Sequence, residues 1–290
     1  MKNRIQDRVG LGWRSELAVG ILSNLDRIDV VEVIADDLFG APQDERRALR
    51  TLSAQTMVVL HGVSLGLASS APVETKLLEK TARLCEQVAP EYWSEHLAFV
   101  RGGGVEIGHL TAPPRTDATI DGAAANLERA RAVVGAAPLV ENIATLIDPP
   151  GSDYSEIEWI NRIIASSSGD LLLDLHNLHA NATNFGYDAI EFLKRLPAER
   201  ITAAHLAGGK WVEALGERRL LDDHLHDVPD PVYRLLSELA ALTPRPLTVI
   251  LERDGAYPPI ESLLRQLDRA RQALAEGRSR QFGQTEEEAA

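Results

Sequence analysis

The stretch PLVENIATLIDPPGSDYSEIEWINRIIASSSGDLLLDLH, residues 138–176, combines two apolar runs with a helical pattern between them. The runs, 138–144 and 170–176, are nearly continuous in apolar residues, which is typical of strands buried on both faces of a parallel sheet. Residues 154–165 carry apolar side chains at helical spacing. The stretch therefore predicts a strand, a helix and a second strand parallel to the first.

The same alternation extends along most of the chain. Further helical patterns cover 72–89, 121–134 and 230–242. The predicted strands are 8–13, 29–35, 57–62, 92–99, 138–144, 170–176, 201–208 and 247–254. Eight strands with helices between them predict an α/β protein with a (β/α)8 TIM barrel. A doubly wound open sheet is the rival fold, but no Gly-rich phosphate-binding turn follows the first strand.

The length and composition agree with one barrel domain. The chain has 290 residues, of which 44% are hydrophobic and 25% charged, and a typical barrel of this kind has about 250 residues. No apolar run approaches the roughly 18 residues of a membrane-spanning helix. We expect a single domain over 1–276. The segment 277–290, GRSRQFGQTEEEAA, is polar and charged, so we expect a disordered tail there.

The charge and the cysteine content limit the partners and the compartment. Acidic residues outnumber basic residues by 43 to 30, giving a formal charge of -13, which argues against a nucleic-acid binder because that function needs a basic face. The basic N-terminus lacks the apolar segment of a secretory signal. The single cysteine, Cys85, cannot form an internal disulfide and is expected to pack on a helix. A cytoplasmic protein is expected.

Most of the predicted strands carry an ionisable residue near their carboxyl end. These residues are His61, His96, Glu141, Asp174, His205 and Glu252. The carboxyl ends of barrel strands converge on one face, and buried charges are costly unless they are paired or bound to metal. One histidine in a strand is more often a hydrogen-bonded core residue, but this set from six strands favours a metal centre. Imidazole and carboxylate ligands suit Fe, Mn or Zn.

A second cluster follows the seventh predicted strand, in LLDDHLHDVPD, residues 220–230. Asp222 and His224 form a D-x-H pair, which alone is a weak signal because solvated loops often contain Asp and His. Beside a predicted metal centre, the pair becomes a continuation of that centre. Eight ligands exceed the number that one ion accepts, so two or three metal ions are expected. No catalytic group beyond these ligands is assigned.

Three more polar residues are weaker candidates. His176 and Asn177 follow Asp174 closely, and a continuing strand would place His176 on the same face as Asp174 and Asn177 on the other. We keep His176 and Asn177 as candidates for lining the site. His109 lies in a Pro-flanked loop and is expected at the surface.

With these residues in place, the chain resembles the multinuclear non-heme iron-dependent oxidative enzymes, a family that includes the methanobactin biosynthesis oxidase. The matching segments are GLGWR (10–14), EVIADD (32–37), HGVSLGLAS (61–69), SEHLAF (94–99), ENIA (141–144), DLHNLHANATNFGYD (174–188), HLAGG (205–209), LDDHLHDVPDPVY (221–233) and LERD (251–254). Their order and spacing cover nearly the whole predicted fold, so the resemblance is specific.

The resemblance implies a xylose-isomerase-like TIM barrel that holds two or three iron ions, as Fe(II) and Fe(III), and uses O2 as co-substrate. The residues that match the family's metal ligands are His61, His96, Glu141, Asp174, His205, Asp222, His224 and Glu252. Members typically oxidise Cys or a neighbouring residue of ribosomally made precursor peptides, and a leader-binding partner protein often presents the peptide.

The chain departs from the family pattern at three positions. Many members carry Asn where this chain has His176, and HLAGH where it has HLAGG, ending at Gly209. Asp37 stands where Asn is common. These departures suggest a subgroup.

Two other functions remain open at this stage. One is a sugar isomerase or a phosphodiesterase-type hydrolase that uses Mn or Zn on the same barrel, since a fold does not fix a function. An isomerase would work without O2, so oxygen dependence separates it from the oxidative enzyme. The other is a non-catalytic metal-binding or peptide-presenting module, which the occupied ligand positions disfavour.

Overall fold

A computed structural model describes residues 6–102 and 105–288. Its main sheet is a closed barrel of eight strands in the order β1-β12-β9-β8-β7-β4-β3-β2. These strands are β1 (Arg8–Gly12), β2 (Val30–Ile34), β3 (Met57–Gly62), β4 (Trp93–His96), β7 (Leu139–Glu141), β8 (Leu171–Asp174), β9 (Ile201–Leu206) and β12 (Thr248–Leu251). Each coincides with one of the eight strands expected from the sequence. The predicted (β/α)8 barrel is confirmed.

Helices alternate with the barrel strands. They are α1 (Ala18–Leu22), α2 (Gln43–Ser53), α3 (Thr75–Val88), α4 (Asp117–Val134), α5 (Glu156–Ala165), α6 (Leu175–Phe185), α7 (Ala189–Arg195), α8 (Asp230–Leu242) and α9 (Ile260–Glu288), with short 3-10 turns η1 (Ser15–Leu17), η2 (Asp36–Leu38) and η3 (Ala198–Arg200). The four helical patterns of the sequence correspond to α3, α4, α5 and α8. The sequence sets the ends of helix α4, because Thr116 caps its N-terminus and Gly135 ends it in the left-handed region.

The chain divides into two compact units, and each is described by itself. Unit 1 comprises residues 1–30 and 173–290, and unit 2 comprises residues 31–172. The expectation of a single domain over 1–276 therefore stays a prediction.

Unit 2 contains parallel strand pairs and a hairpin. Residues of β4 lie beside those of β7 in a register that pairs His96 with Glu141, and β3 pairs His61 with Ser94 of β4. The antiparallel hairpin of β5 (Phe99–Gly102) and β6 (Val105–Thr111) follows β4. The sequence analysis did not predict this hairpin, because its exposed second strand lacks an apolar run.

Unit 1 also contains an unpredicted hairpin. Strands β10 (Gly209–Ala214) and β11 (Glu217–Asp222) pair in antiparallel register. Their turn places Leu215 and Gly216 at positive φ, 56° and 79°, which matches the backbone twist of a tight hairpin. The hairpin connects β9 to the segment that contains the D-x-H pair, so it fixes where that segment begins.

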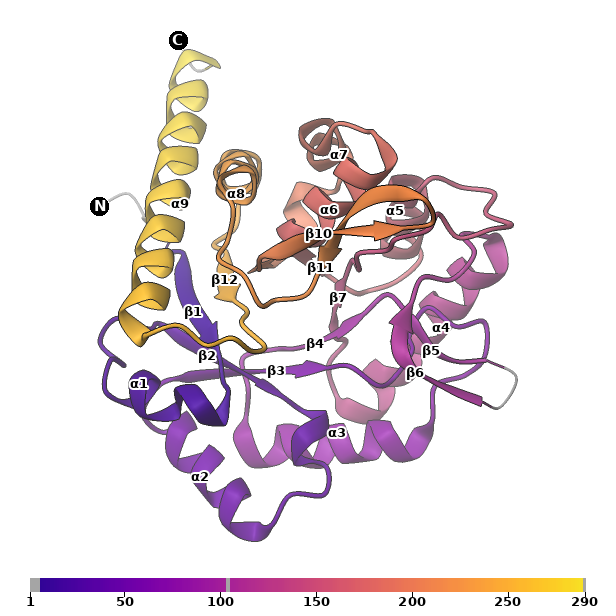
Figure 1. The fold of residues 1–290 in the computed structure, drawn as a ribbon. Helices are drawn as coiled ribbons and strands as arrows, with labels where there is room; N and C mark the ends of the chain where they lie inside the picture. The colour runs from indigo at the N-terminus through magenta and orange to yellow at the C-terminus, as the bar shows by residue number, and fades with distance from the viewer. Residues whose placement is uncertain (1–5, 103–104, 289–290) are drawn as a thin grey trace. The chain divides into compact units, whose positions relative to one another are not determined.

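The C-terminal segment differs from the expected disordered tail. Helix α9 continues through Gly277 to Glu288, and it packs beside α8 (Figure 1). A Cβ atom on Gly277 would lie 2.2 Å from the carbonyl oxygen of Ser237, so the glycine allows the two helices to approach closely. Arg278 is buried and donates hydrogen bonds to Asp7. The segment is polar in composition, but one of its charged residues is buried in an ion pair. Residues 289–290 lie outside the described part of the chain.

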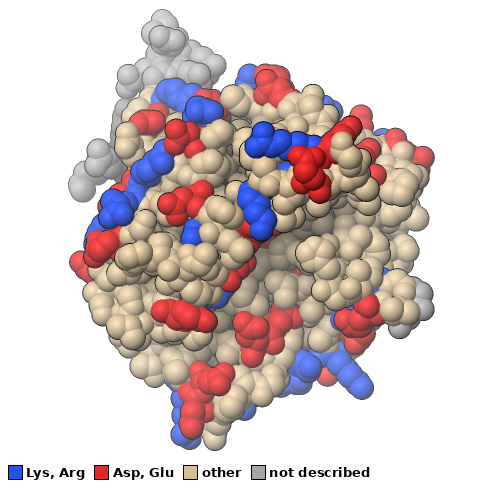
Figure 2. Space-filling view, viewed as in Figure 1, with Lys and Arg blue, Asp and Glu red and all other residues tan. Residues whose placement is uncertain are grey.

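The surface carries charges of both signs. On the face shown in Figure 2, Lys and Arg are interspersed with Asp and Glu. Among the described residues, no helix combines the length and the apolar character needed to cross a membrane.

Candidate metal centre

Two buried histidine side chains of unit 2 lie beside one carboxylate oxygen of a buried glutamate. The Nε2 atoms of His61 and His96 each lie 3.5 Å from Oε2 of Glu141. The two imidazole rings meet edge to face, with centroids 4.6 Å apart. All three residues end or nearly end a barrel strand, as their position in the sequence predicted.

This spacing fits a shared cation. Donor atoms about 2.1 Å from one ion lie about 3.0–3.4 Å apart at octahedral or tetrahedral angles. The 3.5 Å separations in unit 2 are close to that range and longer than ordinary N–H···O hydrogen bonds. Imidazole and carboxylate donors also match the ligand preferences of iron, manganese and zinc. The residues present therefore fit a bound transition-metal ion.

A neighbouring hydroxyl orients His61. Its Nδ1 lies 2.8 Å from Oγ of Ser94, and that hydroxyl donates to the carbonyl of Leu60. With a metal ion bound at Nε2, the ring proton would lie on Nδ1, where Oγ of Ser94 can accept it. An imidazole held in this tautomer is prepared for metal binding.

Two buried carboxylates of unit 2 were missed by the sequence analysis. Glu95 accepts the backbone N–H groups of Leu65 and His96 at 3.1 and 2.9 Å, and one of its oxygens lies 3.6 Å from Nδ1 of His96. An oxygen of Glu32 lies within 4.8 Å of a ring nitrogen of His61. Both glutamates are 1% exposed. Glu32 interrupts the apolar run VVEVI, which is the signal that also marks Glu141, whereas Glu95 lies between Ser94 and His96.

Unit 1 holds a second group of donors. Ligand atoms of Asp174, His205 and Glu252 lie within 4.8 Å of one another, and Nδ1 of His205 is 3.1 Å from Oε2 of Glu252. All three side chains are buried. Oδ1 of Asp174 accepts the N–H of Asn177 and so caps α6. The start of α6 thus holds the Asp174 carboxylate in place.

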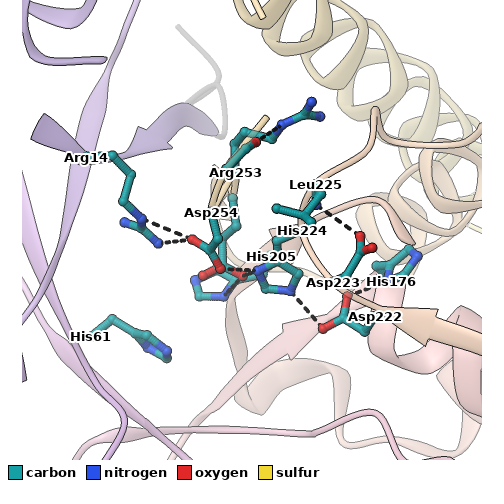
Figure 3. A network of polar contacts seen from close by, with 12 residues as sticks. Arg14, His61, His176, His205, Asp222, Asp223, His224, Leu225, Arg253 and Asp254 are labelled. Carbon is teal, nitrogen blue, oxygen red and sulfur yellow. Dashed lines mark hydrogen bonds and ion pairs between the residues drawn. The ribbon is translucent and has the colours of Figure 1, made fainter. Parts of the chain in front are cut away.

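A line of polar contacts runs through the same unit (Figure 3). Arg14 donates through Nε to Asp254 at 3.0 Å, and the other oxygen of Asp254 lies 2.9 Å from Nδ1 of His224. Nε2 of His224 is 2.8 Å from Oδ2 of Asp222, whose Oδ1 is 2.7 Å from Nδ1 of His176. Five ionisable side chains thus hold one another in fixed orientations.

These contacts shift the proton affinities of the two D-x-H residues. Burial acts to lower the pKa of His224, but the charge of Glu252 and the bonds to Asp222 and Asp254 outweigh it, so the pKa lies well above its usual value. Burial acts to raise the pKa of Asp222, but the bonds from His176 and His224 outweigh it and lower the pKa. Each group therefore stabilises the charged form of the other.

His176 lies in α6, because β8 ends at Asp174 and the strand does not continue. Its side chain is fully buried and contacts Asp222, while Asn177 is also buried at the start of the helix. A Cβ atom on Gly209 would lie 2.6 Å from Cε1 of His176 and 2.2 Å from the carbonyl oxygen of Leu221. The absence of a side chain at Gly209 therefore leaves the space that the His176 ring needs.

The predicted ligands fall into two groups within the described residues. Those that join groups of possible metal donors are His61, His96, Glu141, Asp174, His205 and Glu252. Asp222 and His224 are not in these groups; they contact each other, and Nδ1 of His224 lies 3.8 Å from Oε2 of Glu252. His109 is exposed, as expected, but it lies on strand β6 and not in a loop. Arg14 and Asp254 were not predicted, since their pairing joins segments 240 residues apart.

Solved structures of other proteins share this fold. An L-ribulose 3-epimerase matches with a TM-score of 0.61 and 14% identity, covering 98% of this chain and 99% of that chain. A xylose isomerase domain protein from Salmonella typhimurium matches at 0.60 and 16%, covering 94% and 99%. Endonuclease IV from Thermus thermophilus matches at 0.55 and 17%, covering 93% and 99%. These similarities support a xylose-isomerase-like barrel and speak for the fold alone.

Sequence relatives are more similar. A UPF0276 protein of Streptomyces avermitilis is 35% identical over 278 residues, which are 93% of this chain and 56% of the relative. The chain thus spans little more than half of that protein. UPF0276 proteins of Rhizorhabdus wittichii and Bordetella bronchiseptica are 32% and 31% identical, covering 84% and 93% of this chain and 86% and 93% of the relatives.

The family comparison covers nearly the whole barrel. Residues 8–275 match the family described as RiPP precursor modification enzyme MbnB/TglH/ChrH. The matched residues include both groups of buried donors, and the match confirms the resemblance noted in the sequence. The chain belongs to the MbnB/TglH/ChrH family of RiPP precursor modification enzymes.

Proposed function

We propose that this protein is an iron-dependent enzyme that uses O2 to oxidise a ribosomally made precursor peptide at Cys or a neighbouring residue. The observation that carries the proposal is the convergence of His61, His96 and Glu141 at 3.5 Å in a member of a peptide-modifying family. The full proposed set of ligands for two or three irons is His61, His96, Glu141, Asp174, His205, Asp222, His224 and Glu252.

Iron would supply a redox-active Lewis acid that binds O2 and a substrate thiolate. The residues of the chain would hold it in place and tune it. Ser94 would accept the Nδ1 proton of His61 and leave Nε2 free to bind the metal. The capping bond from Asn177 fixes Asp174, and His176 fixes Asp222. Such orienting contacts commonly change metal affinity about 10–100-fold.

Metal content is the first test. The protein is purified without oxygen, loaded with iron-57 and examined by elemental analysis and Mössbauer spectroscopy. We expect two or three irons per chain in wild type and a loss of iron in the His96→Gln variant. The exposed His109 provides a matched control, because His109→Gln makes the same chemical change outside the donor groups. Equal iron content in both variants would contradict the assignment of His96.

Activity is the second test. Candidate precursor peptides, chosen as short Cys-bearing reading frames beside the gene, are incubated with the iron-loaded protein. We expect O2 consumption and a peptide mass change that both disappear in Glu141→Gln. The requirement for a leader-binding partner is examined by adding the product of a neighbouring gene. Peptide modification that proceeds equally without O2 would defeat the oxidative proposal.

A sugar isomerase or a phosphodiesterase-type hydrolase using Mn or Zn is the second candidate. The observation that favours it is the shared fold with an L-ribulose 3-epimerase and with endonuclease IV. Protein that purifies with Zn or Mn, consumes no O2 after iron loading and converts ketosugars or cleaves phosphodiesters would establish this candidate instead.

A further inference from the structure

A basic cavity of unit 2 lies outside the donor groups. It has a volume of about 220 Å³ and is lined by side chains of η2, α2 and α3. Its lining residues are Leu38, Phe39, Arg46, Lys80, Arg83, Leu84 and Gln87. Three cations and three apolar side chains thus share one concave surface on a chain whose formal charge is -13. We call it the basic cavity.

The cations of the basic cavity lack acidic partners. Arg46, Lys80 and Arg83 make no ion pair or side-chain hydrogen bond to any residue in 6–102 or 105–288, and Lys80 lies over the ring of Phe39 at 5.5 Å. The neighbouring Arg47, which does not line the cavity, instead lies 3.7 Å from Asp44. Because acidic residues are in excess, unpaired cations around one cavity mark a place where an anion is favoured.

Helical spacing explains the common face. Arg83 and Leu84 lie three and four residues after Lys80, and Gln87 lies four and three residues after them, so all four share one side of α3. Arg46 in the first turn of α2 faces the same cavity. Cationic groups set beside apolar ones suit a ligand that carries carboxylates next to an apolar side chain.

The cavity is connected to the loop that follows a proposed metal ligand. Asp36 begins η2, which also contains Leu38, and its Oδ2 accepts the N–H of Val63 at 2.9 Å. Val63 follows His61 by two residues. Asp36 also bonds to Ser64. One short turn therefore contacts both the basic cavity and the loop beyond His61.

We propose that the basic cavity binds an acidic segment of the peptide substrate, with carboxylates at the three cations and an apolar side chain against Phe39 and Leu84. This inference rests on the proposed function in one respect: that the bound peptide is the substrate of the enzyme. The negative charge of the whole chain repels an acidic peptide, so local cations within a Debye length of about 8 Å would be needed to hold it.

The test uses the full iron-loaded protein and a fluorescent synthetic peptide in which Glu and Asp flank one Leu. A matched peptide carries Gln and Asn instead. The cavity variant is Arg46→Gln/Lys80→Gln/Arg83→Gln. The control variant, Arg47→Gln/Arg50→Gln/Lys76→Gln, removes the same charge from the same two helices at residues that do not line the cavity.

Fluorescence anisotropy gives the affinities. We expect the cavity variant to bind the acidic peptide at least about ten-fold more weakly than wild type, and the control variant to stay within about two-fold. We also expect the neutral peptide to bind more weakly than the acidic one. Equal losses in the two variants would show a general charge effect and overturn the proposal, as would equal binding of both peptides.

Two further arms identify the ligand and separate the inferences. If inorganic phosphate at the same concentration as the peptide displaced it, the cavity would be a site for an inorganic anion, and the peptide proposal would be overturned. The Glu141→Gln variant is measured in parallel, and its peptide affinity is expected to match wild type, because Glu141 does not line the cavity. Cavity-dependent binding supports the inference even if no O2-dependent oxidation is found, a result that would count against the proposed function alone.

Discussion

Nδ1 of His176 lies 2.7 Å from Oδ1 of Asp222, and the second oxygen of that carboxylate lies 2.8 Å from Nε2 of His224. His176 is fully buried, and its Nε2 atom has no hydrogen-bond partner among the described residues. Its polar contact is therefore directed at Asp222. His176 is thus placed to orient the Asp222 carboxylate. Carboxylates that bind a metal ion are commonly held by a hydrogen bond of this kind.

Replacing His176 tests this role. His176→Phe keeps an aromatic ring of similar shape but removes the Nδ1 contact. We expect the affinity for the metal proposed at Asp222 to fall about 10–100-fold, as measured by competition with a chelator. His179→Phe is the matched control on the same helix. An unchanged metal affinity in His176→Phe would contradict the positioning role.

Gly209 tests the packing around the same ring. In Gly209→Ala, the new Cβ would meet the carbonyl oxygen of Leu221 at 2.2 Å and His176 at 2.6 Å. Because the nearer obstacle is backbone, we expect a loss of roughly 2 kcal/mol or more in the free energy of unfolding. Gly40→Ala is the control, since its Cβ would meet nothing within 4 Å. Urea denaturation of both variants provides the comparison, and similar midpoints would refute the expected clash.

Arg278 tests the role of the C-terminal helix. Its guanidinium donates to Asp7 at 2.6 and 2.9 Å and to the carbonyls of Ala240 and Arg245 at 2.9 and 2.7 Å. Arg278→Met leaves a largely buried carboxylate and three carbonyls, with that of Thr243 as the third, without this donor, so we expect a cost of about 3–5 kcal/mol. The more exposed Arg280→Gln is expected to cost less than about 1 kcal/mol. Thermal unfolding measures both, and a neutral Arg278→Met would contradict a stabilising role for the C-terminal helix.

Cys85 gives a prediction of pH dependence. Burial raises the pKa of its thiol to about 11. Since the thiolate is the reactive form, alkylation by iodoacetamide at pH 8 should be about 100-fold slower than for a free thiol of pKa near 8.5. The rate should rise with pH until it approaches pH 11, as long as the protein stays folded. Rapid labelling of the native protein at pH 8 would contradict the effect of burial.

The raised pKa of Cys85 also makes the free energy of unfolding depend on pH. The folded thiol holds its proton more tightly than the unfolded one, so its contribution is fully present below the unfolded pKa and is lost as the pH rises toward about 11. Cys85→Ser should therefore reduce the loss of stability between pH 9 and pH 11. Denaturation at several pH values measures this difference, and parallel profiles for both proteins would contradict it.

The barrel was predictable because its signals are local. Each strand is a short apolar run, and the polar residue near its end, such as Glu141 or Asp174, stands out against that run. Glu32 carries the same signal within the run VVEVI, whereas Glu95 has polar neighbours on both sides. The resemblance to the family rested on these segments in order, and the family match over 8–275 confirms it.

Tertiary structure decided the contacts between distant segments. His176 meets Asp222 across 46 residues, and Arg278 meets Asp7 across 271 residues. The space that Gly209 leaves for His176, the exposed hairpins, and the cations gathered from α2 and α3 also depend on folding. Residue type and spacing determine whether a segment forms a strand or a helix, because backbone hydrogen bonding and periodic burial act over a few residues. Which side chains then share a charge, a proton or a cavity depends on the packing of elements far apart in the chain.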